Sequence, residues 1–272
     1  MRHDNGSAVT IGAYDGVHIG HRQVIEHVRR RATTGGLRSV VVTFDKNPAA
    51  VVNPAAAPPR LTDIDLKLEL LAGTGVDHIL VIEFDAERAK ERAEDFVAEV
   101  LVAELSARVV VVGDDFHFGH QRRGNVALLQ AMGEEAGFSV EPVHLVSDER
   151  VHQVVSSTRI RGLIAKGELA EAATLLGRPH EVRGLVVDSG ETEPGENARL
   201  AVEVPGEILL PPPGEYPGFA LGDAGESVAA RLVVPGRDGK GPQRVEISAV
   251  GVPAGRPSFQ GEIGEVVRVR FG

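Results

Sequence analysis

The chain has 272 residues, 42% of them hydrophobic, and its 29 basic and 39 acidic residues give a formal net charge of −10 at pH 7. This length suits one large or two ordinary domains, each with a buried core. The negative charge argues against a broad nucleic-acid-binding surface, because such surfaces are basic. The lack of cysteine excludes disulfides, thiol nucleophiles and cysteine-based zinc sites. Because the sequence shows no signal-peptide pattern and no run of 18 apolar residues, we expect a soluble cytoplasmic protein without a membrane partner.

Apolar segments alternate with helical patterns over the first two-thirds of the chain. We expect strands at residues 8–12, 39–44, 78–84, 108–113 and 138–145. One helix is expected to present Val24, Ile25 and Val28 on its apolar face and to end at Gly35 and Gly36; others start after Thr62-Asp63 and span residues 86–105. This alternation predicts an α/β domain with a parallel sheet, helices on both faces and ligands beyond the carboxyl ends of the strands.

The pattern changes after Gly184, where turns rich in proline and glycine separate short apolar segments. We expect strands at residues 185–187, 199–204, 228–234, 244–249 and 266–271. Segments such as "PPPGEYPG" and "PGRDGKGP" are interpreted as turns. This pattern predicts a small antiparallel β-barrel. The expected domains are residues 1–182 and 183–272.

The segment "GAYDGVHIGH", residues 12–21, follows the first strand and leads into the first helix. The first turn of a helix attracts phosphate, because its backbone N–H groups lack partners and carry partial positive charge. Gly16 and Gly20 would let the backbone approach a ligand, and His18 and His21 would donate hydrogen bonds to a nucleotide α-phosphate as pyrophosphate leaves. Two alternatives are a pair of surface histidines and a zinc site, although no third zinc ligand is nearby in the sequence.

Two further segments have both a functional and a structural interpretation. Asp115, Phe116 and Phe118 follow a predicted buried strand, where the rings would line a pocket for a flat aromatic ligand or anchor the loop to the core. In "SSTRIR", the hydroxyl residues 156–158 would cap a helix or contact phosphate together with Arg161. Asp15 would orient a histidine or hold the turn.

Five segments occur in the same order as motifs of bacterial FAD synthetases. They are "GAYDGVHIGH", "VVTFDKNPAAVV", "LTDIDLKLELLAGTGVDHILVIEFD", "VVGDDFHFGHQRRGN" and "VSSTRIRGLIAKGELAEAATLLGRPH". The first resembles that family's Gly-x-Phe-Asp-Gly-Val-His-x-Gly-His signature. The resemblance covers about two-thirds of the chain and implies a Rossmann-like nucleotidylyltransferase domain. The implied reaction transfers AMP from ATP to FMN, with Mg²⁺, to give FAD and pyrophosphate.

The resemblance also implies roles for individual residues. The implied catalytic residues are Asp15, His18, His21 and Arg161. The implied nucleotide-binding residues are Gly12, Ala13, Tyr14, Gly20, Ser157 and Thr158. The implied flavin-binding residues are Asn47, Pro48, Asp115, Phe116, Phe118 and Arg122. No metal ligand and no oligomeric state is implied.

Three positions depart from the family pattern: Tyr14 replaces a usual Phe, Asn47 a common His, and Asn125 a usual Asp. Two alternatives stay open; the changes at Asn47 and Asn125 leave room for the first, and the intact His-x-Gly-His and Ser-Ser-Thr-x-Ile-Arg motifs argue against the second. One is a paralogue that uses another nucleotide triphosphate or another acceptor. The other is a regulatory or accessory protein that binds flavin nucleotides with little turnover.

The last third of the chain resembles the family's riboflavin kinase barrel only weakly. The family's Pro-Thr-Ala-Asn motif is absent, and the corresponding region carries Glu191, Glu193 and Glu196, which would repel a triphosphate. Asn197 and Arg199 fall where the motif's Thr and Asn are expected, and Glu246 corresponds to the family's catalytic Glu. We therefore expect a truncated barrel without riboflavin kinase activity, retained for stability, partner contact or substrate positioning.

Overall fold

The computed structural model describes residues 5–144, 147–148, 153–190, 199–222, 226–236, 241–250 and 262–272. The chain forms two compact units, unit 1 with Met1–Pro58 and Lys67–Val155, and unit 2 with Pro59–Leu66 and Ser156–Gly272. The barrel strands of unit 2 begin at Glu181, next to the expected boundary, but unit 2 also includes residues 59–66 and 156–180. The division at residues 182 and 183 stays a prediction.

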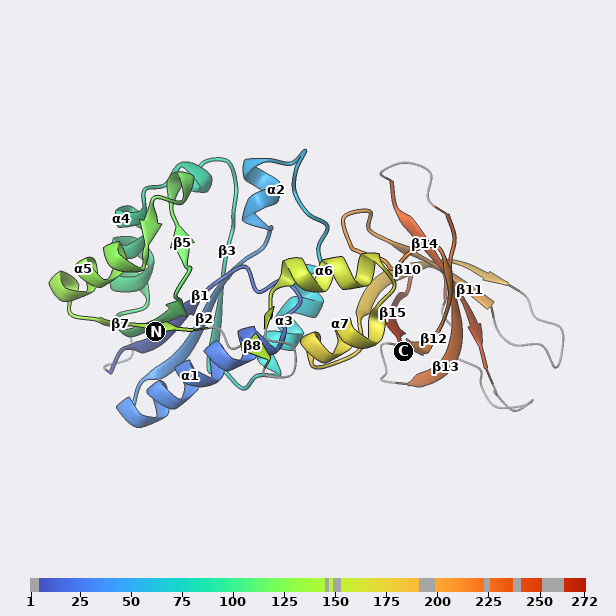
Figure 1. The fold of residues 1–272 in the computed structure, drawn as a ribbon, viewed down its shortest axis with the longest axis horizontal. Helices are drawn as coiled ribbons and strands as arrows, with labels where there is room; N and C mark the ends of the chain where they lie inside the picture. The colour runs from blue at the N-terminus through green and yellow to red at the C-terminus, as the bar shows by residue number, and fades with distance from the viewer. Residues whose placement is uncertain are drawn as a thin grey trace. The chain divides into compact units, whose positions relative to one another are not determined.

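Unit 1 is built on a parallel sheet of five strands in the order β3-β2-β1-β4-β7 (Figure 1). The strands are β1 (Ser7–Ile11), β2 (Arg38–Phe44), β3 (His78–Ile82), β4 (Ala107–Gly113) and β7 (Ser139–Val143). All five were expected from their apolar patterns, with ends that differ by one or two residues. Pro142 lies in β7, which is an edge strand and so tolerates a residue without an N–H donor.

Helices cover both faces of this sheet. The helical segments of unit 1, apart from the first residues of α3, are α1 (Ile19–Gly35), α2 (Pro48–Val52), α3 (Ile64–Ala72), η1 (Arg88–Lys90), α4 (Ala93–Phe96), η2 (Val97–Glu104), η3 (His120–Arg122) and α5 (Val126–Ala136). Val24 and Val28 of α1 pack with Ala8 on one face, whereas Val97 of η2 and Leu129 of α5 pack with Val9 on the other. The sheet is therefore enclosed between two helical layers, as the α/β pattern predicted.

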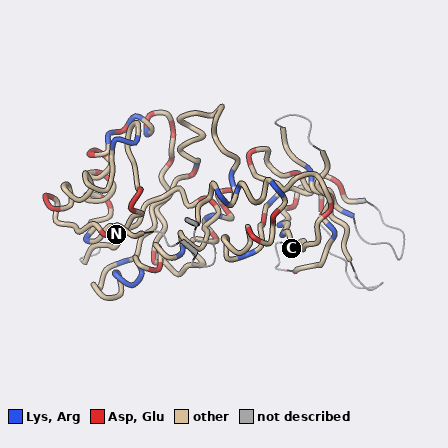
Figure 2. Tube along the Cα trace, viewed as in Figure 1, with Lys and Arg blue, Asp and Glu red and all other residues tan. Residues whose placement is uncertain are grey.

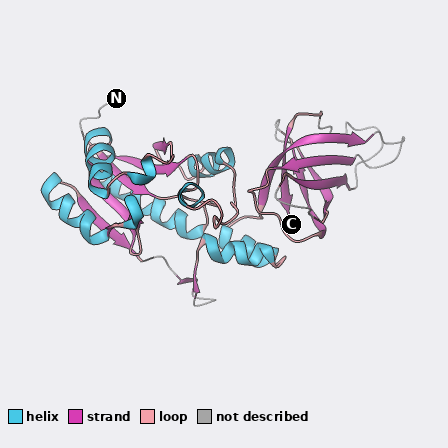
Figure 3. Cartoon of the chain, turned by 90° about the horizontal axis from the view of Figure 1, so that it is seen from above, coloured by secondary structure: helices cyan, strands magenta, loops and turns pink. Residues whose placement is uncertain are grey.

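Unit 2 contains two helices and a closed antiparallel barrel in the strand order β10-β11-β14-β13-β12-β15. The elements are α6 (Ser157–Ala165), α7 (Leu169–Leu176), β10 (Glu181–Gly190), β11 (Arg199–Val204), β12 (Gly214–Leu221), β13 (Ser227–Val234), β14 (Gln243–Ala249) and β15 (Val266–Phe271). Figure 3 shows the barrel as strands joined by loops. The predicted fold class, an α/β domain followed by a small antiparallel barrel, is confirmed.

Two predictions of local structure were wrong, and one predicted strand was too short. The segment "GEYPG" is the start of strand β12 rather than a turn, because Pro217 and its glycines fit between β13 and β15. Residues 185–187 are the middle of the longer strand β10. Residues 86–105 form three short helical segments rather than one helix, with a break at Glu91, whose backbone is extended. The remaining short strands, β5 (His117–Phe118), β6 (Gly124–Asn125), β8 (Ser147–Asp148) and β9 (Gln153–Val154), form two small hairpins.

Acidic and basic residues are scattered along the described parts of both units, and no single basic stripe stands out there (Figure 2). Among the described residues, no helix is long and apolar enough to cross a membrane.

Candidate active site

The predicted site of unit 1 lies where the strand order reverses. The chain runs from β1 outward through β2 to β3, and then returns to the other side of β1 for β4 and β7. The turn after β1 and the loop after β4 therefore leave neighbouring strands at the same edge of the sheet. In open α/β sheets this switch point at the carboxyl ends of the strands is where ligands bind.

The turn after β1 has an unusual backbone. Tyr14 and Val17 adopt positive φ angles of 51° and 38°, and Gly16 has a φ of 80°. Non-glycine residues with positive φ are strained, and such strain concentrates at functional sites. The Tyr14 hydroxyl lies 2.7 Å from Thr10 Oγ1, and both side chains are buried. The hydroxyl that distinguishes Tyr14 from the family's usual Phe is thus bonded inside the protein.

His18 and His21 lie together at the N-terminus of α1. Their rings stack with centroids 3.6 Å apart, and the edge of the Tyr14 ring meets His21 at 5.0 Å. His18 is the N-cap residue, and its Nδ1 accepts a hydrogen bond from the His21 backbone N–H at 3.3 Å. His18 is only 2% exposed, so the alternative of two surface histidines is wrong for His18.

The hydrogen bonds of His18 fix where its proton lies. Because Nδ1 accepts this bond, a proton on the His18 ring is on Nε2. Burial, and then the neighbouring His18, hold the pKa of His21 well below its usual value, so His21 is neutral at pH 7. Its Nδ1 is buried and has no hydrogen-bond partner among the described residues. The carboxyl residue of the turn, Asp15, is also buried.

Gly20 is the glycine at which close approach matters. A Cβ atom at Gly20 would lie 3.3 Å from His18 Nδ1 and 3.6 Å from the Val155 carbonyl oxygen. Glycine therefore lets α1 begin directly behind the His18 ring. Gly12 and Ala13, which were predicted to bind the nucleotide, lie between the end of β1 and Tyr14 in the same turn.

The segment after β2 places Asn47 and Pro48 at the start of α2, after the carboxyl end of the strand next to β1. Asn47 Oδ1 accepts a hydrogen bond from the Ala49 N–H at 3.0 Å, and Pro48 occupies the first turn. Asn47 thus has a local role as an N-cap, which asparagine fills as well as any residue.

The loop after β4 carries the predicted flavin residues. The rings of Phe116 and Phe118 stack at 5.3 Å, and Phe118 meets Phe96 at 5.9 Å. Both rings are partly exposed and also pack against the core, so the structure is compatible with either predicted role. Asp115 is exposed, and Arg122 has a φ of 58°.

The hairpin that follows this loop is tightly packed. A Cβ atom at Gly119 would lie 2.6 Å from the Ala93 backbone nitrogen, and one at Gly124 would lie 2.7 Å from Ala93 Cβ and 2.8 Å from Phe118 Cε1. Asn125 Oδ1 accepts from the Leu128 N–H at 2.9 Å and caps α5. Asparagine and aspartate are equally good N-caps, so this departure preserves the local structure.

The predicted phosphate-binding residues of "SSTRIR" belong to unit 2. Ser156 caps α6, and its hydroxyl accepts from the Arg159 N–H at 3.3 Å. Ser157 and Thr158 form the first turn, and Arg161 Nη2 donates to Thr158 Oγ1 at 3.3 Å. Their arrangement around the histidines stays a prediction. In unit 1 the chain reaches this segment through Val155, next to Gly20.

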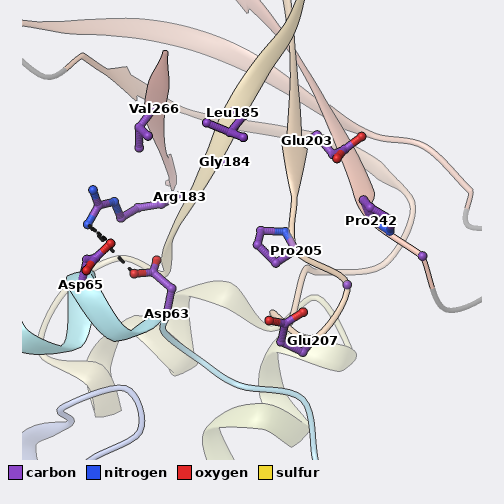
Figure 4. Close-up of a pocket in the computed structure, with 12 residues that line it drawn as sticks. Asp63, Asp65, Arg183, Gly184, Leu185, Glu203, Pro205, Glu207, Pro242 and Val266 are labelled. Atoms are coloured by element: carbon purple, nitrogen blue, oxygen red, sulfur yellow. Dashed lines mark ion pairs between the residues drawn. The ribbon is translucent and has the colours of Figure 1, made fainter. Parts of the chain in front are cut away.

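Unit 2 has a cavity of its own, of about 560 Å³, on the barrel (Figure 4). Its side chains include Asp63, Asp65, Glu203 and Glu207, and Arg183 pairs with the first two at 4.0 and 3.8 Å. The carboxylates outnumber the arginine, so this cavity does not suit a polyanion.

Comparison with known proteins identifies the family. The sequence profile of FAD synthetase matches residues 1–159. The chain belongs to the FAD synthetase family. Similar relatives are the bifunctional riboflavin kinase/FMN adenylyltransferases of Escherichia coli (strain K12), 37% identical over 186 residues, and of Haemophilus influenzae, 37% identical over 182 residues. These matches cover 68% and 67% of this chain, and 59% and 58% of the respective relatives.

The chain thus spans less than two-thirds of the length of these curated FAD synthetase relatives. A crystal structure of a macrolide-efflux protein from Streptococcus pneumoniae is also similar, with a TM-score of 0.80, 24% identity, and coverage of 100% of this chain and 86% of that one. At this identity the likeness concerns the fold alone, and it extends over both units.

Sequence patterns missed several residues that shape the site. Thr10, Phe96 and Lys67 were not assigned a role. Thr10 and Phe96 lie within apolar patterns that indicate only burial. Lys67 lies between Leu66 and Leu68 in an apolar segment. This pattern could have indicated a buried lysine, and a buried lysine needs a hydrogen-bond or charge partner.

Proposed function

We propose that this member of the FAD synthetase family is an FMN adenylyltransferase that joins ATP and FMN to give FAD and pyrophosphate. The observation that carries the proposal is the stacked pair His18 and His21, held at the N-terminus of α1 at the sheet's switch point. This arrangement places two imidazole rings at a helix N-terminus, which suits a phosphate that gains negative charge.

In the proposed reaction, a phosphate oxygen of FMN attacks the α-phosphorus of ATP. A new P–O bond forms, the bond between the α-phosphorus and the bridging oxygen breaks, and pyrophosphate leaves. His18 and His21 stabilise the charge on the transferring group, while Phe116 and Phe118 hold the isoalloxazine ring. Ser157, Thr158 and Arg161 would bind the nucleotide phosphates. No covalent intermediate with the protein is required.

The proposed metal is Mg²⁺ that arrives with ATP. Among the described residues there is no group of three or more His, Asp or Glu side chains that could hold a metal ion. This fits Mg²⁺, which usually binds substrate phosphates, water and only one or two carboxylates. When bound, the ion would neutralise phosphate charge, and Asp15 and Asp115 are the carboxylates of the predicted site.

The departures at Asn47 and Asn125 give little support to a different acceptor. Both side chains cap helices, a role that keeps the local backbone in place. A paralogue with another nucleotide or acceptor, and a regulatory protein that binds flavin nucleotides, remain the alternatives that a substrate panel separates.

We further propose that the barrel has no riboflavin kinase activity. Glu246, the counterpart of the catalytic Glu, pairs with Arg244 at 3.6 Å, and Arg244 also pairs with Asp188 at 3.5 Å. Arg199 is on the exposed face of β11, whereas Glu191, Glu193, Glu196 and Asn197 lie outside the described residues. A general base without a phosphate cradle loses most of its effect, because positioning and charge stabilisation dominate phosphoryl transfer.

The proposal is tested by product analysis on the purified chain. ATP, GTP, CTP and UTP are each supplied with Mg²⁺ and with FMN or riboflavin, and the flavins are separated by chromatography. We expect FAD only from ATP and FMN. A different dinucleotide would favour the paralogue, binding without turnover would favour the regulatory protein, and FMN formed from riboflavin would overturn the assignment of the barrel.

A further inference from the structure

Lys67 is a buried lysine near the start of α3, with only 8% of its surface exposed. Its Nζ donates to the Phe44 carbonyl oxygen at 2.5 Å and to the Ala13 carbonyl oxygen at 3.4 Å. Burying an ammonium group is costly unless the group forms hydrogen bonds, so these two bonds stabilise the buried position of Lys67. Lys67 therefore joins three segments of unit 1: α3, the turn after β1 and the end of β2.

The two carbonyl groups belong to the two halves of the proposed site. Ala13 lies in the nucleotide turn, five residues before His18, where the histidine pair begins. Phe44 ends β2, directly before the segment that contains Asn47 and Pro48. Lys67 thus holds the predicted nucleotide segment against the predicted acceptor segment, which is the alignment that a two-substrate transfer needs.

Lys67 also contacts the Ala13–Tyr14 peptide group through the Ala13 carbonyl oxygen. Its bond to the Ala13 oxygen, supported by Thr43 Oγ1 at 3.4 Å, sets the direction of the Ala13–Tyr14 peptide immediately before the strained φ of Tyr14. A cation at a carbonyl oxygen polarises the peptide and strengthens its N–H as a donor. The Tyr14 N–H has no acceptor among the residues that the structure describes, so it is available to an anion.

We propose that Lys67 is a positioning residue for adenylyl transfer. It orients and polarises the Ala13–Tyr14 peptide so that the Tyr14 N–H supports the phosphate, and it keeps the nucleotide turn in register with the end of β2. This inference rests on the proposed function. Lys67 acts through the backbone of the turn and not by touching the substrates.

The first test compares Lys67→Met, which removes the charge, with Lys67→Arg, which keeps it. Lys90→Met is the matched control, because Lys90 is an exposed lysine of unit 1 that pairs with Glu87. We expect Lys67→Met to lower kcat for FAD formation by about 10- to 100-fold, less than the loss of a direct donor, with the KM values for ATP and FMN nearly unchanged. Lys67→Arg should retain most of the turnover, and Lys90→Met all of it.

A structural role alone would give a different result. It would lower the melting temperature and the fraction of protein that binds flavin, but not the turnover per binding-competent site. Titration of FMN fluorescence gives that fraction for each variant. Lys67→Met with normal turnover per competent site would overturn the proposal.

The cysteine-free sequence allows a second test that restores the charge chemically. Lys67→Cys carries the only thiol in the chain, so 2-bromoethylamine on the unfolded protein, followed by refolding, places an ammonium at this position alone. Iodoacetamide adds a neutral group of similar size as the control. We expect turnover to recover at least tenfold with the aminoethyl group and not with the neutral group, a contrast of at least about 1.4 kcal/mol. Equal turnover after both treatments would contradict the proposed role.

The unsubstituted chain separates the two proposals. FAD formed by the unsubstituted chain and equally by Lys67→Met would overturn only the role of Lys67. Absence of FAD with the unsubstituted chain would overturn the proposed function, and this role of Lys67 with it.

Discussion

Substitution of Gly124 by alanine should weaken FMN binding while leaving ATP binding unchanged. Gly124 has an ordinary backbone conformation, so the added methyl group acts only through contact. It would lie 2.7 Å from Ala93 Cβ and 2.8 Å from Phe118 Cε1, closer than side chains tolerate. The Phe118 ring must move, and the stack with Phe116 must move with it.

Overpacking by one methyl group in a well-packed site costs about 1–3 kcal/mol. If this cost is relieved by displacement of the Phe118 ring from the flavin position, the dissociation constant for FMN should rise by about 5- to 150-fold, because each 1.4 kcal/mol is a factor of ten. FMN fluorescence titration and calorimetry with MgATP measure the two affinities separately. Gly236→Ala is the control, since a Cβ atom there meets nothing within 4 Å.

A second substitution tests the contact itself. Ala93→Gly removes the nearest methyl group, so the double variant Ala93→Gly/Gly124→Ala should recover part of the FMN affinity. An unchanged FMN affinity in a folded Gly124→Ala variant would refute the role of this loop in flavin binding. Equal losses for FMN and ATP would instead assign Phe118 a purely structural role in unit 1.

Three further predictions concern histidines. In steady-state assays, His21→Ala should lower kcat by about 10²–10³-fold, as for loss of one oxyanion donor. His18→Asn, which keeps an N-cap acceptor, should lower kcat by the same factor. Near-normal turnover in both variants would contradict the role of the two histidines. The pKa of His21 is low in the free protein, and a bound anion should raise it. MgATP binding should therefore take up protons, and the affinity for MgATP should increase as pH falls. Calorimetry in buffers of different ionisation enthalpy measures this proton uptake, and no uptake would contradict the prediction. Burial lowers the pKa of His180 from 6.5 to about 4, so the folded state loses stability relative to the unfolded state as pH falls from 6.5 toward 4, by about 3 kcal/mol in all. Urea unfolding of wild type and His180→Gln across this pH range should therefore give unfolding free energies that depend differently on pH. Parallel pH dependences would contradict this.

The sequence was a good guide to elements whose local signals agree. The five sheet strands of unit 1 and the cap of α3 were predicted, because apolar runs and Asp63 give clear signals. For α6, capping was one of two predicted roles of residues 156–158, and the structure gives the cap to Ser156. Strand β12 was missed because Pro217 and its neighbouring glycines are typical of turns, and only the two flanking strands make a strand there favourable.

The sequence indicated which motifs form the predicted site, but not how their side chains are arranged. The sequence placed His18 and His21 three residues apart, yet their stacking and the burial of His18 depend on the strained turn and on Gly20. The role of Lys67 is the clearest example of a feature that the local sequence does not reveal. Its two acceptors are 23 and 54 residues away in the chain, and they come together only when β1 and β2 pair.

The most direct test of adenylyl transfer follows the phosphorus atoms. The purified chain is incubated with FMN, Mg²⁺ and ATP labelled at the α-phosphorus, and in a parallel reaction at the β- and γ-phosphorus atoms. We predict that the α-label appears in FAD and that the β- and γ-labels appear together in pyrophosphate, in equal amounts. An α-label that stays with the adenine nucleotide in the presence of FMN, with no labelled FAD, would contradict the proposed function.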